Sequence, residues 1–193
     1  MDNTLFDKAL NFAAAKHSGM QRKNSAAPYI LHPLEVAVIA GSITSDIEIL
    51  AAAVLHDTVE DTDTSIEEIE QTFGKRVSFL VKAETENKRP EKDPALTWTL
   101  RKEESIQELK NTDDIGVKII WLADKLSNMR SFYSAWKTEG DKLWNKFNQK
   151  DPALQAWYYR AVKEAVSLLK DTDAWKEYDR LTEIVFSNVK TEN

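Results

Sequence analysis

The sequence predicts an all-α protein of about nine or ten helices with no significant β-sheet. Apolar residues recur at spacings of three and four along most of the 193 residues, which is the period of a helix packed on one face. Alternating apolar and polar runs joined by short turn sequences, which would predict hairpins, are missing. Only 5 glycines and 5 prolines interrupt the chain, so it has little room for long irregular segments.

Capping residues and glycines divide the first part of the chain into four predicted helices. The stretches Ser45–Glu48 and Ser65–Glu68 each have the pattern of a capping box, in which a serine and a glutamate satisfy the free amides of a helix start. The four helices are predicted from Thr4 to near Gly19, from around Pro33 to Gly41, from Ser45 into residues 55–65, and from Ser65 to Gly74.

Later helices are predicted from the same signals. Asp93-Pro94 is a typical helix start, because proline suits the first turn and aspartate caps it. The stretch before it, "ENKRPEKDP", is predicted to be the most exposed connection. These helices are expected near residues 75–85, 94–110, 113–137, 151–170 and 173–188.

Composition favours one globular domain spanning 1–193 and excludes several classes of function. Hydrophobic residues make up 42% and charged residues 30%, which is not the composition of a disordered chain. The net charge of −6 argues against nucleic acid as a partner. Without cysteine, a metal must be held by His, Asp and Glu. The acidic N-terminus and the lack of a membrane-length apolar run predict a cytoplasmic protein with no membrane partner. Oligomeric state is not predicted.

The stretch "LHDTVEDTDTS", residues 55–65, carries one histidine and four acidic residues after a strongly apolar segment. On a continuous helix His56 would lie four positions before Glu60, and Asp57 four before Asp61, so all four would share one rim. The simplest explanation of this acidic cluster is a solvated last turn of the helix. Negative charge is nevertheless disfavoured at a helix C-terminus, and buried carboxylates repel one another. A bound divalent cation would remove both conflicts.

Two further residues are candidate metal ligands. His32, in "PYILHP", lies among apolar residues, where a packed and hydrogen-bonded imidazole is the alternative role. Asp124 interrupts an apolar helical stretch, "IIWLADKLSNMRS", where a salt bridge is the alternative. His17, at a predicted helix end, would favour the helix dipole and is left out of the ligand set.

The order of these residues resembles the H…HD…D pattern of the HD-domain metal-dependent phosphohydrolases. Three blocks, "RKNSAAPYILHP", "AAAVLHDTVEDTDTS" and "DIGVKIIWLADKLSNMRS", closely resemble the hydrolase domain of RelA/SpoT-type alarmone enzymes, especially the stand-alone small alarmone hydrolases. The resemblance covers residues 5–135 and leaves 136–193 as a C-terminal helical extension.

The resemblance implies an HD fold that binds one Mn²⁺ and hydrolyses the 3′-pyrophosphate of guanosine tetra- and pentaphosphate (ppGpp and pppGpp). Zn²⁺ or Fe²⁺ would satisfy the same ligand types. Glu60 and Asp61 match the family's acidic pair, as catalytic groups that orient or deprotonate a water or as acceptors that fix a ligand. The implied metal ligands are His32, His56, Asp57 and Asp124.

The resemblance also implies substrate contacts, at Arg22, Lys23, Asn128 and Ser131. Arginine and lysine suit phosphates, although two basic residues in a loop are often only solvated surface. Arg130 is either a phosphate contact or a salt-bridge partner. Trp121 departs from the family pattern, which has a basic residue there in many members.

Two other functions remain open at this point. The chain can be an HD phosphohydrolase for (p)ppApp, another nucleotide or a dinucleotide, or a metal-containing alarmone sensor without turnover. The C-terminal aromatic residues are expected to pack in a core, with Tyr158–Arg160 as an alternative wall of a nucleotide pocket. The aromatic residues meant are Trp144, Trp157, Tyr158 and Trp175.

Overall fold

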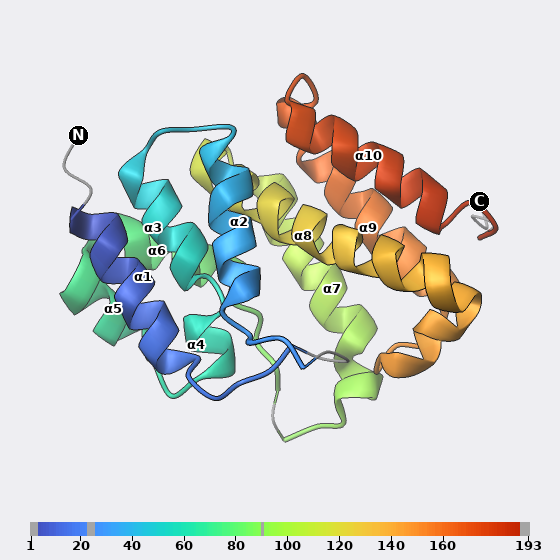
Figure 1. Cartoon of the computed structure of the whole chain (residues 1–193), viewed down its shortest axis with the longest axis horizontal. Coiled ribbons are helices and arrows are strands. Elements are labelled where there is room, and N and C mark those ends of the chain that lie inside the picture. Colours follow the sequence, from blue (N-terminus) through green and yellow to red (C-terminus); the bar gives the residue numbers. More distant parts are fainter. Residues whose placement is uncertain (1–3, 23–25, 90, 190–193) are drawn as a thin grey trace. The chain divides into compact units, whose positions relative to one another are not determined.

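The structure, a computed structural model, describes residues 4–22, 26–89 and 91–189. These residues form ten α-helices and two short 3₁₀ helices (Figure 1). Apart from one isolated bridge between Gln21 and Pro28, they contain no β-structure, so the all-α prediction is confirmed. None of the helices in these ranges combines the length and the apolar character that a membrane crossing requires.

The chain divides into two compact units. The first unit contains the residues up to Thr85 together with Asp114–Asp124. The second contains Glu86–Asp113 and the residues from Lys125 onward, so the boundary falls within the long helix α8 (Ile115–Glu139). That 1–193 acts as a single domain stays a prediction.

Helix α3 (Ile47–Leu55) is the central helix of the first unit. Helices α1 (Thr4–Lys16), α2 (Leu31–Gly41) and α6 (Lys75–Glu84) each pack against it, and α6 also packs against α5 (Ile66–Phe73). All side chains from Ala51 to Leu55 are fully buried. A helical stretch that is apolar on every side, as Ala51 to Leu55 is, belongs inside a protein.

Local hydrogen bonds explain where the helices of the first unit begin. Ser65 Oγ accepts from the amide of Glu68 at 3.1 Å, which confirms the capping residue predicted for α5. The prediction that Ser45 caps α3 is wrong. Asp46 does so instead, because it has the extended backbone of a cap and its Oδ1 accepts from the amide of Glu48 at 2.9 Å.

The third helix, predicted to run into residues 55–65, ends earlier than a continuous helical rim over residues 56–61 requires. Helix α3 ends at Leu55, and a separate single turn, α4, spans Thr58–Asp61. Side chains take the carbonyl groups that a continuing helix would need: Thr58 Oγ1 donates to the Leu55 carbonyl, and His56 Nδ1 lies 2.8 Å from the Ala53 carbonyl. The chain therefore turns at His56 and Asp57.

In the second unit α9 (Pro152–Ala165) packs against both α7 (Pro94–Asn111) and α10 (Asp173–Val185). Asp93 caps α7 through Ala95, as predicted. The helix predicted over 151–170 is shorter than expected, because the chain tightens into a 3₁₀ turn at Ser167–Leu169.

Aromatic side chains form much of the core of this unit. Trp144 stacks on Phe186 with ring centroids 5.3 Å apart, and Phe132 lies edge-on to Tyr159 at 5.3 Å. Tyr158 and Tyr159 are buried. These contacts support the packing role expected for Trp144 and Tyr158 rather than an exposed pocket wall.

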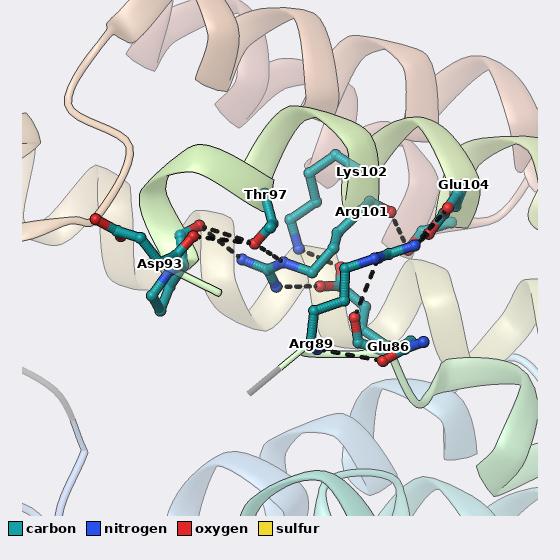
Figure 2. A network of polar contacts seen from close by, with 10 residues as sticks. Glu86, Arg89, Asp93, Thr97, Arg101, Lys102 and Glu104 are labelled. Carbon is teal, nitrogen blue, oxygen red and sulfur yellow. Dashed lines mark hydrogen bonds and ion pairs between the residues drawn. The ribbon is translucent and has the colours of Figure 1, made fainter. Parts of the chain in front are cut away.

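The connection predicted to be the most exposed, residues 86–94, is exposed at several positions but anchored at Glu86. Figure 2 shows Arg101 and Lys102 of α7 directed at the Glu86 carboxylate, with Arg101 Nη1 2.7 Å from Oε2. Arg89 makes two hydrogen bonds with Glu104, at 2.6 and 2.8 Å. These ion pairs hold the connection against α7.

Candidate metal centre

Two histidines and an aspartate converge in the first unit. His32 comes from the first turn of α2, His56 follows α3, and Asp124 comes from α8. Each offers one ligand atom, and these atoms lie within 4.8 Å of one another at buried positions. His32 Nε2 is 3.0 Å from Asp124 Oδ1, and His56 Nε2 is 3.8 Å from the same oxygen.

Asp57 adds a second carboxylate to this cluster. Its Oδ2 is 3.2 Å from His56 Nε2 and 3.5 Å from His32 Nε2. Asp57 stands in the cap position of α4, yet its side chain makes no capping hydrogen bond. The break between α3 and α4 therefore turns this carboxylate into the cluster, so the structure brings together the side chains of all four predicted ligands.

The hydrogen bonding of His56 fits a metal ligand. Its Nδ1 faces the Ala53 carbonyl, which can only accept, so Nδ1 carries the hydrogen and the lone pair of a neutral ring is on Nε2. That Nε2 is buried and faces the carboxylate oxygens of Asp57 and Asp124, at 3.2 and 3.8 Å. Two imidazole nitrogens with two carboxylate oxygens form a donor set suited to a divalent transition metal.

The charges in the cluster shift the pKa values of its members. Burial alone would lower the pKa of His56, but Asp57, Asp124 and Glu84 raise it to about 10. Burial would raise the pKa of Asp57, but His56 and His32 hold it well below its usual range. Glu84, buried near the end of α6, is a contributor that the sequence analysis did not identify.

Tyr29 is a second residue that the sequence analysis did not assign to the site. Its hydroxyl lies 2.6 Å from Asp57 Oδ2 and 2.7 Å from Asp61 Oδ2. Its ring stacks on His17, with centroids 5.0 Å apart and an angle of 22°. Burial and the two carboxylates raise the pKa of Tyr29, so the hydroxyl stays protonated.

The acidic pair Glu60 and Asp61 lies in the single turn α4, and both residues are half-buried. Asp61 is joined to the cluster through Tyr29. Glu60 precedes it in the same turn. The continuous helical rim expected for these residues does not exist. They nevertheless follow the cluster residues His56 and Asp57 closely in the sequence.

The predicted substrate contacts are distributed over both units. Arg22, half-buried, precedes the described segment that leads to Tyr29, while Lys23 lies outside the described residues. Asn128 is half-buried and Ser131 exposed, and both belong to the part of α8 in the second unit. Their roles stay predictions.

Two other residues of α8 have clear partners. Arg130 makes hydrogen bonds of 2.8 and 2.6 Å with Glu177, which supports the salt-bridge role. Trp121 is buried and donates from Nε1 to the Ala83 carbonyl at 3.2 Å. This tryptophan, which departs from the family pattern, thus has a packing role within the first unit.

An all-α fold with two histidines and two aspartates at one buried point is the arrangement of an HD domain. The profile of the HD domain family matches residues 9–153, and the chain belongs to this family.

Several relatives carry the name guanosine-3′,5′-bis(diphosphate) 3′-pyrophosphohydrolase. The chain is 42% identical over 127 residues to MESH1 of Mus musculus and of Homo sapiens; this stretch is 64% of the chain and 66% of each relative. It is 37% identical over 128 residues to an Aquifex aeolicus protein of that name, covering 65% of the chain but only 17% of the longer relative.

Solved structures are similar over more of the chain. A crystal structure from Listeria monocytogenes is 33% identical, with a TM-score of 0.70 over 81% of this chain and 99% of the other. A structure described as a metazoan ortholog of SpoT that hydrolyses ppGpp is 29% identical, with a TM-score of 0.72 over 97% of both chains.

Proposed function

We propose that this chain hydrolyses the 3′-pyrophosphate of ppGpp and pppGpp, giving GDP or GTP and pyrophosphate. The observation that carries the proposal is the convergence of His32, His56, Asp57 and Asp124 at one buried point. Membership of the HD family and the activity named for the MESH1 relatives support it.

The proposal assigns these four residues to one Mn²⁺, although Zn²⁺ and Fe²⁺ suit the same donor atoms. A divalent cation held there would polarise a phosphoryl oxygen and lower the pKa of water. The side chains themselves keep the ligand atoms oriented: His56 through the Ala53 carbonyl and Asp57 through the Tyr29 hydroxyl.

We assign the proton transfer to Glu60 and Asp61. In the reaction a water oxygen bonds to phosphorus, the bond to the 3′ oxygen breaks, and that oxygen leaves with a proton. A carboxylate beside the cluster can take the proton that the water loses. Glu60 and Asp61 are the two ionisable residues of α4, and Asp61 is already linked to Asp57 through Tyr29.

Substrate binding is assigned to Arg22, Lys23, Asn128 and Ser131. A nucleotide with several phosphates needs local positive charge, because the chain as a whole has a net charge of −6. Arg22 and Lys23, which precede Tyr29 in the sequence, would supply this charge. The proposal includes a small-molecule substrate, no nucleic-acid or membrane partner and a cytoplasmic location, which suits a chain without cysteine.

The test is a chromatographic product assay on metal-stripped protein, with Mn²⁺ added or withheld. Mn²⁺-dependent release of GDP and pyrophosphate from ppGpp is the expected result. The adenosine analogue of ppGpp and GTP are assayed in parallel. Preferential turnover of either nucleotide would identify it, and not ppGpp, as the substrate. Tight binding of ppGpp without turnover under any of these conditions would contradict the proposed hydrolase activity and favour an alarmone sensor.

A further inference from the structure

The hydroxyl of Tyr29 occupies an unusual position between two carboxylates. It lies 2.6 Å from Asp57 Oδ2 and 2.7 Å from Asp61 Oδ2. These two aspartates are 28 and 32 positions further along the chain. A phenol has one hydrogen to donate, so the two acceptors share it. Hydrogen bonds to ionised acceptors are short and about twice as strong as neutral ones.

The rest of Tyr29 is fixed on several sides. Its amide donates to the Met20 carbonyl at 2.9 Å, and its own carbonyl accepts from the amide of His32 at 2.9 Å. The ring lies between His17, on which it stacks, and the edge of His32 at a centroid distance of 6.2 Å. A side chain held in this way can in turn hold its partners.

A purely structural tyrosine in the same chain shows the contrast. Tyr178, fully buried in the second unit, donates its hydroxyl to a backbone carbonyl, that of Tyr159, at 2.9 Å. One neutral acceptor is enough to satisfy a buried phenol. Tyr29 instead joins one predicted metal ligand to one predicted proton acceptor.

We propose that Tyr29 is a positioning residue of the metal centre, whose hydroxyl fixes Asp57 for the cation and Asp61 for the reacting water. The inference rests on the proposed function for the role of Asp61 and on the ligand geometry alone for the role of Asp57. Loss of such an outer partner typically costs a metal site about 10- to 100-fold in affinity or activity.

The test replaces Tyr29→Phe, which removes the hydroxyl and keeps the ring that stacks on His17. Mn²⁺ binding to metal-stripped protein is measured by calorimetry without nucleotide. The Kd should rise about 10- to 100-fold. Tyr178→Phe, the matched control, should keep the Kd within about twofold of wild type, because its hydroxyl lies outside the ligand shell. A folded Tyr29→Phe protein with the wild-type Kd would overturn the proposal.

A second readout addresses Asp61. At saturating Mn²⁺ the kcat of Tyr29→Phe for ppGpp should fall about tenfold or more, while KM stays nearly unchanged, because positioning acts on the chemical step. An unchanged kcat would overturn the link to Asp61. Wild-type protein that binds Mn²⁺ but leaves ppGpp intact would overturn the proposed function and leave the calorimetric result valid.

A further variant covers the case in which Tyr29→Phe does not fold by circular dichroism. Asp61→Ala removes the second carboxylate and leaves the Tyr29 hydroxyl to Asp57 alone, so the kcat for ppGpp should fall about tenfold or more, because the proposal assigns Asp61 to the reacting water. Asp63→Ala, at an exposed position two residues later, removes the same charge without touching Tyr29. Equal effects of the two substitutions would overturn the proposal.

Discussion

His32 Nε2 lies 3.0 Å from Asp124 Oδ1, although the two residues come from α2 and α8 at distant points of the sequence. Their side chains meet beside His56, which follows the last residue of α3, the helix against which α2 packs. The ligand set is therefore a product of tertiary packing in the first unit, and removing one member should affect metal and reaction together.

Asp124→Ala should abolish Mn²⁺ binding and turnover. The side chain is a direct ligand in the proposal, so the loss should exceed the roughly 100-fold typical of an outer partner. Calorimetry on metal-stripped protein and the product assay measure both effects, and circular dichroism should show that the helices remain. Asp113→Ala, at an exposed position before α8, is the control. Full activity of Asp124→Ala would contradict the proposed metal site.

Glu60→Gln should separate the chemistry from metal binding. If the carboxylate takes a proton from water, kcat should fall by about 10²- to 10⁴-fold while the Kd for Mn²⁺ stays near wild type. Glu67→Gln, an exposed glutamate in α5, should leave both unchanged. Loss of Mn²⁺ would instead identify Glu60 as a ligand.

Mn²⁺ affinity should increase with pH. The neighbouring carboxylates raise the pKa of His56 to about 10, so at neutral pH a cation must displace the imidazole proton. Below that pKa, each displaced proton makes the affinity rise about tenfold per pH unit. Titrations in buffers of different ionisation enthalpy would count the released protons. If the affinity for Mn²⁺ were the same at about pH 6 and about pH 8, no proton would be displaced on binding. That result would contradict a protonated His56 in the metal-free protein.

Asp114→Asn should change the acid sensitivity of the fold. Both terminal nitrogens of the Arg76 guanidinium, Nη1 and Nη2, donate to Asp114, which lowers the pKa of that carboxyl. A lowered pKa stabilises the folded state above the unfolded value of about 3.9, and the contribution is lost as pH falls through the folded pKa. The Tm of Asp114→Asn should therefore be lower than wild type at neutral pH, and the two should converge in acid. A constant difference in Tm would contradict this account.

Glu86→Gln should destabilise the protein more than Glu104→Gln. Glu86 has a side chain only 9% exposed and faces Arg101 and Lys102, which would keep their charges without a counterion (Figure 2). Breaking such a buried pair costs about 3–5 kcal/mol. Glu104 is 44% exposed and pairs with Arg89, so its loss should cost about 1 kcal/mol or less. Urea unfolding measures both, and equal costs would contradict the buried character of the Glu86 contacts.

Helix starts could be predicted where the deciding hydrogen bond is local. Ser65 and Asp93 cap helices through amides two or three residues away, and both were identified correctly. Ser45 and Asp46 are both suitable caps, and only the backbone conformation selects Asp46. The turn after α3 was missed because the Thr58 and His56 side chains compete with the helix for its carbonyl groups.

The candidate site could be predicted only in part, because some of its contacts depend on residues far apart in the sequence. The histidine and aspartate pattern is visible in the order of the residues and in the family resemblance, so the candidate ligands could be named. The hydroxyl of Tyr29 and the buried charge of Glu84 reach the cluster only through the packing of separate segments. Neither has a sequence spacing that distinguishes it from an ordinary core or surface residue.

The alanines of α3 limit how the metal centre can diversify. Ala51, Ala52 and Ala53 have no exposed surface, and three helices pack against α3. A larger side chain there has no space, and displacement of the Ala53 backbone would carry the imidazole of His56 with it. We therefore expect low tolerance to substitution at these three alanines, which are not themselves proposed ligands, and expect changes in substrate preference to arise in segments outside this helix.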